Sequence, residues 1–231
     1  MTAKRYIRIF GMPREEIEAK VADILPKGLQ IHPCDAPGEA LLIARADSET
    51  ALLPLLIETR LRLGQAIYAI DAEEGGSLAG AAVHTLRQRG WTCATCESLT
   101  GGLIAATLVE VPGASEVVRG GLITYQTDTK TLLAGVPEET IVQHDVVSAE
   151  VALAMAEGAR ARLGVDIAVS ATGLAGPGGG TPEKPVGTVF LGVATERGSR
   201  AIPLHLTGDR GQIRRLTVQH ALHILRIEAL K

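Results

Sequence analysis

The sequence predicts an α/β protein in which a three-layer α/β/α domain with a mixed sheet, residues 77–231, follows a small α+β domain, residues 1–73. Short strand and helix patterns alternate in the first region, whereas the second carries longer helices and strands rich in β-branched residues. A polar, glycine-bearing stretch at 71–76 separates the two regions. The chain has 231 residues, of which 46% are apolar and 21% charged, and this suffices for two folded domains.

The first region is expected to form one small α+β sandwich. Apolar residues alternate around Ile7 and Ile9, which is typical of a strand, and Pro13 followed by acidic residues favours a helix start. The expected elements are a strand at 6–10, a helix at 13–25, strands at 29–32 and 40–46, a helix at 48–63 and a strand at 65–70. Their order, β-α-β-β-α-β, predicts the sandwich.

The second region alternates helices and strands. Gly90 is placed to end a helix, and Ser148 and Asp209 are placed to cap helix starts. The expected elements are helices at 77–89, 100–110 and 148–163, a short helix ending at 134, a helix from 209 to the end, and strands at 92–96, 122–125, 165–171, 188–194 and 200–206. This alternation, with one hairpin around 197–198, predicts a mixed sheet with helices on both faces.

Composition and charge exclude several classes of protein. The net charge is −3 and aromatic residues make up 3%, so neither nucleic acid nor an anionic membrane is an expected partner. No apolar run reaches about 18 residues, and the first residues lack the apolar segment of a signal peptide. Three cysteines do not make a disulfide framework in a chain of this length. We expect a cytoplasmic protein with no membrane partner.

The densest chemistry lies in the heptapeptide 96–102, where a buried strand ends and a helix begins. A hydroxyl at Ser98 is placed to attack a carbonyl group while free backbone N–H groups of the helix start hold the oxyanion. The segment is not the G-x-S-x-G elbow of the α/β-hydrolases, so no histidine-dependent triad is implied. A simple N-capping role for Ser98 or Thr100 remains an alternative at this level.

A serine nucleophile needs a base, and Lys130 is the best candidate. None of the six histidines lies in a loop flanked by small polar residues. Tyr125 ends a strand and Lys130 lies on the following helix, so both side chains are expected at one edge of the sheet. A lysine works as a base only where burial or a neighbouring cation lowers its pKa. The alternative is a solvated lysine on a helix surface.

The segment 171–181 follows an apolar strand and carries five glycines in eight residues, 173–180. Such a loop lets backbone amides approach a ligand closely, as phosphate-binding loops do, although a merely flexible loop is the alternative. It lacks the G-K-[ST] of a P-loop and the spacing G-x-G-x-x-G. Arg210, Arg214 and Arg215 follow a helix cap and are able to reach a phosphate, although a solvated helix face is the default interpretation.

Cys93 and Cys96 form a CxxC, yet it falls inside a strand, which places the two thiols on opposite faces. Cys34 is too distant in sequence to complete a zinc motif, and no H-E-x-x-H is present. We therefore expect no metal and no cofactor.

Together these segments resemble the C-terminal domain of the CinA family, the nicotinamide-nucleotide amidases. The matching residues are Glu97-Ser98-x-Thr100-Gly101-Gly102, Val111 to Ser115, Tyr125 with Lys130, Val147-Ser148, the run from Thr172 to Thr188, and Gly208-Asp209-Arg210. The first seventy residues resemble, more weakly, the KH-like middle domain of full-length CinA proteins. The chain then lacks that family's molybdopterin-binding-like N-terminal domain, so we expect none of the ADP-ribose pyrophosphatase activity attributed to it.

The resemblance implies metal-independent hydrolysis of the carboxamide of nicotinamide mononucleotide, which gives nicotinate mononucleotide and ammonia. It implies Ser98 as the nucleophile, Lys130 as its base, and Tyr125 and Thr172 as supporting polar groups. Our own assignment of substrate contacts comprises Thr100, Gly101, Gly102, Thr127, Gly176, Gly178, Gly179 and Arg210, with backbone N–H groups near Thr100 and Gly101 holding the oxyanion. Family habit further implies a homodimer.

Two positions depart from the family pattern. Thr127 stands where family members usually carry Asn, and Leu99 stands where the serine is commonly followed by Cys. If the Asn amide orients substrate, its loss lowers activity by about 10²–10³-fold, as for one lost oxyanion donor. A catalytically weakened nucleotide-binding or regulatory protein is therefore the alternative function. The stretch 11–14 does not fit a GxxG loop, so RNA binding is not supported.

Overall fold

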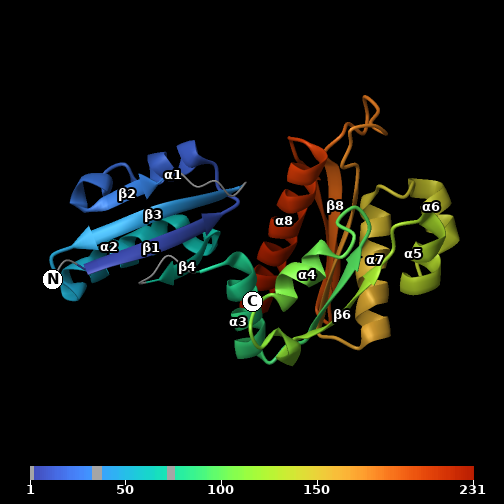
Figure 1. Cartoon of the computed structure of the whole chain (residues 1–231), viewed down its shortest axis with the longest axis horizontal. Coiled ribbons are helices and arrows are strands. Elements are labelled where there is room, and N and C mark those ends of the chain that lie inside the picture. Colours follow the sequence, from blue (N-terminus) through green and yellow to red (C-terminus); the bar gives the residue numbers. More distant parts are fainter. Residues whose placement is uncertain (1–2, 33–37, 72–75) are drawn as a thin grey trace. The chain divides into compact units, whose positions relative to one another are not determined.

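The computed structural model describes residues 3–32, 38–71 and 76–231, and the chain divides into two compact units, Met1–Ala81 and Ala82–Lys231 (Figure 1). Each unit has its own sheet, one of four strands and one of five. Cys34 and residues 72–75 of the expected linker lie outside the described residues.

The first unit is a four-stranded antiparallel sheet with the order β2-β3-β1-β4. Its elements are β1 (Ala3–Phe10), α1 (Arg14–Val21), β2 (Leu29–His32), β3 (Glu39–Ala46), α2 (Glu49–Leu63) and β4 (Ile67–Asp71), with 3-10 turns at Leu25–Lys27 and Gly64–Ala66. Ile7 and Leu42 from paired strands pack with Ile17 and Leu52 from the two helices in one apolar core. This is the predicted β-α-β-β-α-β arrangement, with both helices on one face.

The second unit contains a mixed sheet with the order β6-β5-β7-β8-β9. The strand β5 is parallel to β6 and β7, and β8 is antiparallel to both of its neighbours, β7 and β9. Its strands are β5 (Cys93–Glu97), β6 (Val118–Ile123), β7 (Ile167–Gly173), β8 (Thr188–Thr195) and β9 (Gly198–His205). Its helices are α4 (Leu103–Val109), α5 (Thr127–Ala134), α6 (Glu138–His144), α7 (Ala149–Leu163) and α8 (Arg210–Leu230), and α3 (Leu78–Arg89) spans the division between the units.

Helices cover both faces of this sheet, which confirms the predicted three-layer α/β/α architecture. The helices α4 and α8 lie on one side of the sheet and α5, α6 and α7 on the other (Figure 1). Side chains of β5 alternate between the layers: Ala94 and Cys96 pack with Val151 and Met155 of α7, whereas Glu97 reaches the start of α4. All five residues of β5 are buried, because the strand lies between two others and under two helical layers.

The second unit differs from the predicted pattern in three places. The helix α6 was not predicted, although Pro137 precedes it and Glu138 and Glu139 occupy its first turn. The strand β6 begins at Val118 rather than at 122, and α4 begins at Leu103 rather than at 100. The delayed start of α4 leaves residues 98–102 as a turn at the carboxyl end of β5.

Candidate active site

Ser98 and Lys130 meet at the edge of the sheet where the parallel strands β5 and β6 end. The Lys130 ammonium donates to Ser98 Oγ at 3.2 Å and to the carbonyl oxygen of Thr124 at 2.8 Å. Ser98 directly follows β5, and Lys130 lies one turn into α5, which follows β6. The structure therefore brings together the two residues that were expected to act as nucleophile and base.

Lys130 lies in the interior of the unit, since its side chain is only 1% exposed. Burial lowers the pKa of the Lys130 ammonium, because the charged form loses its hydration, and Cys96 nearby acts in the opposite direction. Burial also raises the pKa of the Cys96 thiol to about 11, so that the neighbouring group is a neutral thiol at physiological pH. Lys130 thus meets the physical condition for a lysine base.

A cavity of about 260 Å³ opens onto this pair. It is slightly smaller than a common ligand pocket, which begins at roughly 300 Å³, and it suits a small polar molecule. Six of its lining residues were predicted site residues, namely Ser98, Tyr125, Thr127, Lys130, Thr172 and Arg210. The remaining lining residues are Leu99, Val146, Val147, Gly173, Leu174 and Ala175. The cavity wall thus combines the Ser98–Lys130 pair, three further hydroxyl groups, a guanidinium group and an apolar side.

The supporting polar residues are held by contacts of their own. Thr172 Oγ1 donates to the carbonyl oxygen of Val146 at 2.7 Å, which ties the end of β7 to the opposite cavity wall. Arg210 donates to Tyr125 Oη at 3.3 Å and to the carbonyl oxygen of Gly176 at 2.8 Å. Tyr125 is 56% exposed, so this arginine–tyrosine pair lies at the mouth of the cavity.

The backbone N–H groups expected to hold an oxyanion are partly occupied in the structure. The Gly101 N–H donates to the Ser98 carbonyl oxygen at 3.1 Å, which corrects our expectation of an oxyanion donor there. The Gly102 N–H donates to the Glu97 carboxylate at 2.9 Å. Both glycines have positive φ, 61° and 98°, which the tight turn requires. Thr100, Gly101 and Gly102 lie in this turn and do not line the cavity.

Two amides of the turn remain available. In the part of the chain that the structure describes, the N–H groups of Leu99 and Thr100 donate to no protein acceptor. Thr100 is fully buried, and within the same described part its hydroxyl oxygen also has no hydrogen-bond partner. Of the two residues, Leu99 lines the cavity, so an oxygen atom of a bound substrate is the kind of acceptor that suits its N–H group.

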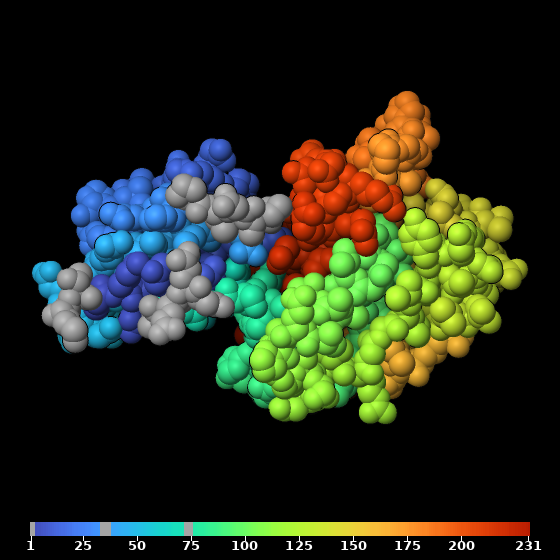
Figure 2. Space-filling view, viewed as in Figure 1, coloured from blue at the N-terminus to red at the C-terminus, as the bar shows by residue number. Residues whose placement is uncertain are grey.

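The glycine-rich segment is placed beside the cavity rather than in it. Gly176 is buried and follows the lining residue Ala175, but Gly178 and Gly179 are exposed and do not line the cavity. Figure 2 shows the loop between β7 and β8 projecting from the surface of the second unit. Lys184 in this loop pairs with Asp145 at 3.0 Å, next to the lining residue Val146. The Gly178 and Gly179 amides therefore do not face the pair of Ser98 and Lys130 in this structure.

Two charged residues, to which the sequence analysis gave no part in the turn after β5, hold that turn in place. The buried Glu97 carboxylate accepts the N–H groups of Gly102, Ile104 and Ala105. Arg214 donates to the carbonyl oxygens of Leu99 at 2.9 Å and Thr100 at 2.8 Å. The role of Glu97 could have been inferred from the sequence, because an acidic residue in a buried strand needs polar partners. The sequence around Arg214 does not distinguish it from the other arginines of α8.

Cys93 and Cys96 are both buried and unbridged. Burial raises the pKa of the Cys93 thiol to about 12, so neither cysteine carries the thiolate that redox chemistry needs. Within residues 3–32, 38–71 and 76–231 no cluster of three His, Cys, Asp or Glu side chains is arranged to hold a metal ion. None of the helices in the same ranges combines the length and the apolar character of a membrane span.

Comparison with known proteins matches residues 76–229 to the CinA C-terminal domain family. A CinA-like protein of Myxococcus xanthus is 40% identical over 236 residues, which cover 97% of this chain and 55% of that protein. A CinA-like protein of Dictyoglomus thermophilum is 41% identical over 232 residues, which cover 96% of this chain and 55% of that protein. The chain therefore spans a little over half the length of these relatives.

Solved structures match about two thirds of this chain. The crystal structure of the competence/damage inducible protein CihA from Agrobacterium tumefaciens has a TM-score of 0.64 and 40% identity, and the match covers 67% of this chain and 94% of that one. A CinA superfamily protein from Escherichia coli has a TM-score of 0.62 and 28% identity, over 65% of this chain and 88% of that one. The family model, the relatives and these structures agree, and the chain belongs to the CinA family.

Proposed function

We propose that this protein hydrolyses the carboxamide of nicotinamide mononucleotide to nicotinate mononucleotide and ammonia, without a metal ion, through Ser98 and Lys130. The observation that carries the proposal is the 3.2 Å contact between Lys130 Nζ and Ser98 Oγ inside a cavity that excludes bulk water from the lysine. The substrate class rests on the resemblance to nicotinamide-nucleotide amidases and on membership of the CinA family.

Acylation begins with neutral Lys130, whose lowered pKa makes this form accessible. Lys130 takes the proton of Ser98 Oγ while the oxygen attacks the carboxamide carbon, which forms a tetrahedral intermediate with a negative oxygen. The N–H group of Leu99, a residue of the cavity lining, stabilises that oxygen. The Lys130 ammonium then gives its proton to the amide nitrogen, the C–N bond breaks, and ammonia leaves a nicotinoyl ester on Ser98.

Deacylation uses the same groups. Neutral Lys130 takes a proton from a water molecule, and the hydroxide oxygen attacks the ester carbon. The C–O bond to Ser98 breaks, Lys130 returns the proton to Ser98 Oγ, and the water oxygen becomes one of the two carboxylate oxygens of the nicotinate product. One water is consumed and one ammonia released for each turnover, so the cycle needs no further reactant.

The rest of the cavity suits the remainder of the substrate. The apolar wall formed by Val146, Val147 and Leu174 offers contact to a pyridine ring. Arg210 at the cavity mouth is the cation available to a phosphate, with the Tyr125 hydroxyl beside it. Lys130 is buried whereas Tyr125 beside Arg210 is exposed, and both line the same cavity, so one molecule is able to present its amide to Ser98 and its phosphate to Arg210.

The proposal is tested by measuring ammonia release from nicotinamide mononucleotide by metal-stripped protein. Ser98→Ala and Lys130→Met are each expected to lower release by at least about 10³-fold, as for loss of a nucleophile or its base. Lys27→Met, which removes an exposed lysine of the first unit, is the matched control and is expected to retain full release. Undiminished release in Ser98→Ala would falsify the mechanism, and no release by the unmodified protein would favour the alternative binding role.

A further inference from the structure

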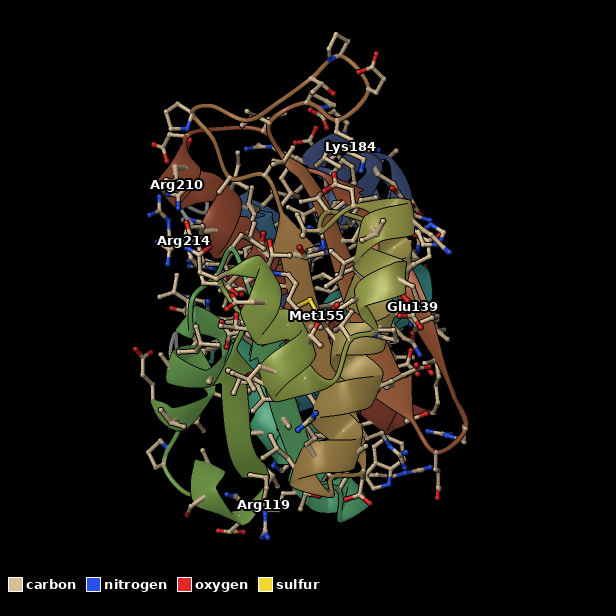
Figure 3. All side chains as sticks on the ribbon, turned by 90° about the vertical axis from the view of Figure 1, so that its right-hand side faces the viewer. Arg119, Glu139, Met155, Lys184, Arg210 and Arg214 are labelled. Carbon is tan, nitrogen blue, oxygen red and sulfur yellow. The ribbon has the colours of Figure 1, made fainter. Side chains whose placement is uncertain are left out.

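Arg214 holds the turn that carries the nucleophile, although it does not line the cavity. Its Nε donates to the Leu99 carbonyl oxygen at 2.9 Å and its Nη2 donates to the Thr100 carbonyl oxygen at 2.8 Å. A Cβ atom on Gly101 would lie 3.7 Å from the same Nη2, so the guanidinium group packs directly on the turn. Figure 3 shows Arg214 on the same side of α8 as Arg210, one turn further along.

These two contacts fix the orientation of two peptide planes. In a trans peptide the C=O of one residue and the N–H of the next point in opposite directions. The Leu99 carbonyl faces Arg214, so the Thr100 N–H points away from it, and the Thr100 carbonyl likewise directs the Gly101 N–H away. The Gly101 N–H meets the Ser98 carbonyl oxygen, whereas the Thr100 N–H donates to no acceptor in the described part of the chain.

The orientation of the turn after Ser98 therefore depends on Arg214, which lies 116 residues later in the chain. We propose that Arg214 is a positioning residue, which holds the Leu99–Thr100 peptide and thereby fixes the turn on which Ser98 and Leu99 face the cavity, so that Ser98 Oγ and the Leu99 N–H are preorganised for the tetrahedral adduct. This role rests on the proposed function in one respect, that Ser98 forms a tetrahedral adduct. Arg214 itself touches neither substrate nor reacting atoms, because it acts through the backbone.

The chemistry of arginine explains why this residue type suits the position. A planar guanidinium group presents two N–H donors in a fixed fork, which matches two successive carbonyl oxygens. Its positive charge also polarises both carbonyl groups, and this strengthens the N–H groups of the same peptide units as donors. A lysine ammonium at the same place supplies the charge but not the fork.

The first experiment compares kinetic constants for ammonia release from nicotinamide mononucleotide. Arg214→Met is expected to lower kcat by about 10–10³-fold, up to the effect of one lost oxyanion donor, with KM within about 2-fold. Arg214→Lys is expected to recover only part of that loss. Arg215→Met removes the adjacent, exposed arginine of α8 and is expected to match the unmodified protein. An unchanged kcat in Arg214→Met overturns the proposal, as does a loss confined to KM.

A second experiment does not depend on amidase activity. Pyridine-3-boronic acid binds a serine nucleophile when Oγ donates an electron pair to boron, and the serine proton passes to Lys130. The resulting tetrahedral boronate places an oxygen where the oxyanion forms. We expect titration by ¹¹B NMR to show binding at least about 10-fold weaker in Arg214→Met than in Arg215→Met, and none in Ser98→Ala.

The two experiments separate the two proposals. If the protein binds the boronate in an Arg214-dependent way but releases no ammonia, the proposed substrate is wrong and the positioning role stands. If ammonia is released and boronate affinity is equal in Arg214→Met and Arg215→Met, the positioning role is wrong and the amidase stands. If the unmodified protein neither binds the boronate nor releases ammonia, both proposals are wrong. Thermal unfolding of each variant shows whether a loss of activity or of boronate binding reflects misfolding. If Arg214→Met is misfolded, the same measurements on Arg214→Lys, which keeps the positive charge, decide whether the positioning role stands.

Discussion

Lys130 illustrates at the scale of a single residue how burial changes the pKa of a side chain. A lysine at the surface stays protonated and cannot accept the serine proton, whereas Lys130 is 1% exposed and its pKa is lowered by that burial. The hydrogen bonds that the ammonium makes go to the Ser98 hydroxyl and the Thr124 carbonyl, neither of which is charged. Neither partner is an anion that would raise the pKa again, so burial increases the fraction of Lys130 that is neutral and able to accept a proton from Ser98.

The lowered pKa of Lys130 predicts a pH dependence of both activity and stability. Activity requires the neutral amine, so kcat/KM is expected to rise with pH in one step whose midpoint lies below the ordinary lysine value of 10.5. Between the lowered pKa and that ordinary value the unfolded chain binds more protons than the folded one, so the free energy of unfolding also rises with pH. Urea unfolding at several pH values checks this, with Lys130→Met as the variant expected to lose that contribution.

Thr127 tests whether this chain is a full or a weakened enzyme. It lines the cavity as the first residue of α5, three positions before Lys130. An Asn at this position adds an amide donor that Thr lacks, so Thr127→Asn is expected to raise kcat by up to about 10²-fold if the native chain is weakened. The measurement is ammonia release under saturating substrate. A lower rate in Thr127→Asn instead shows that the threonine is the residue this cavity requires.

At the scale of elements, Glu97 connects the strand β5 to the helix α4. Its buried carboxylate accepts the N–H groups of Gly102, Ile104 and Ala105, and also the hydroxyl of Thr95. These are N–H groups at a helix start, which have no partner within the helix, and a negative charge there is favoured by the helix dipole. The Glu97 carboxylate thus caps the start of α4, where the turn that begins at Ser98 ends.

Removal of this carboxylate is expected to destabilise the second unit. Glu97→Ala leaves three N–H groups without acceptors, of which that of Ile104 is buried and those of Gly102 and Ala105 are partly buried. At about 1 kcal/mol for each, the free energy of unfolding falls by about 3 kcal/mol. Glu110→Ala, which changes an exposed glutamate at the other end of α4, is expected to stay within about 0.5 kcal/mol of the unmodified protein. Equal urea midpoints for the two variants would show that the capping contacts contribute little.

Local patterns predicted most elements, and the exceptions have physical causes. Period-2 and helical patterns located strands such as β5 and helices such as α7, because burial on one or two faces leaves a direct trace in the sequence. The start of α4 was placed three residues early because Glu97, not Ser98 or Thr100, supplies the cap. The α6 helix has seven residues, too few for a periodic pattern to separate it from a turn.

The site was predictable where it depended on strand ends and not where it depended on distant contacts. Ser98 and Lys130 follow neighbouring parallel strands, and the carboxyl ends of such strands share one edge of a sheet. Arg214 reaches the same turn only because α8 packs beside α4, which no sequence spacing encodes. For the same reason the exposed position of Gly178 and Gly179 did not follow from their glycine-rich pattern.

At the scale of the whole molecule, every residue that lines the cavity belongs to the second unit. The predicted substrate class involves no residue of the first unit, whose role stays open to experiment. A homodimer also stays a prediction; Leu132 and Val142 on the consecutive helices α5 and α6 are 69% and 84% exposed, and they are the apolar side chains that such an interface would first bury.

The second unit is expected to work without the first. The crystallised chain from Agrobacterium tumefaciens matches 67% of this one over 94% of its own length, and the CinA C-terminal domain model covers residues 76–229. Residues 76–231 include the whole of α3 and every cavity residue. A chain cut to these residues is therefore expected to release ammonia from nicotinamide mononucleotide with kcat/KM within about 3-fold of the full chain, a difference of well under 1 kcal/mol. A folded fragment with a loss of 100-fold or more, about 2.7 kcal/mol, would instead assign the first unit a direct part in binding or catalysis.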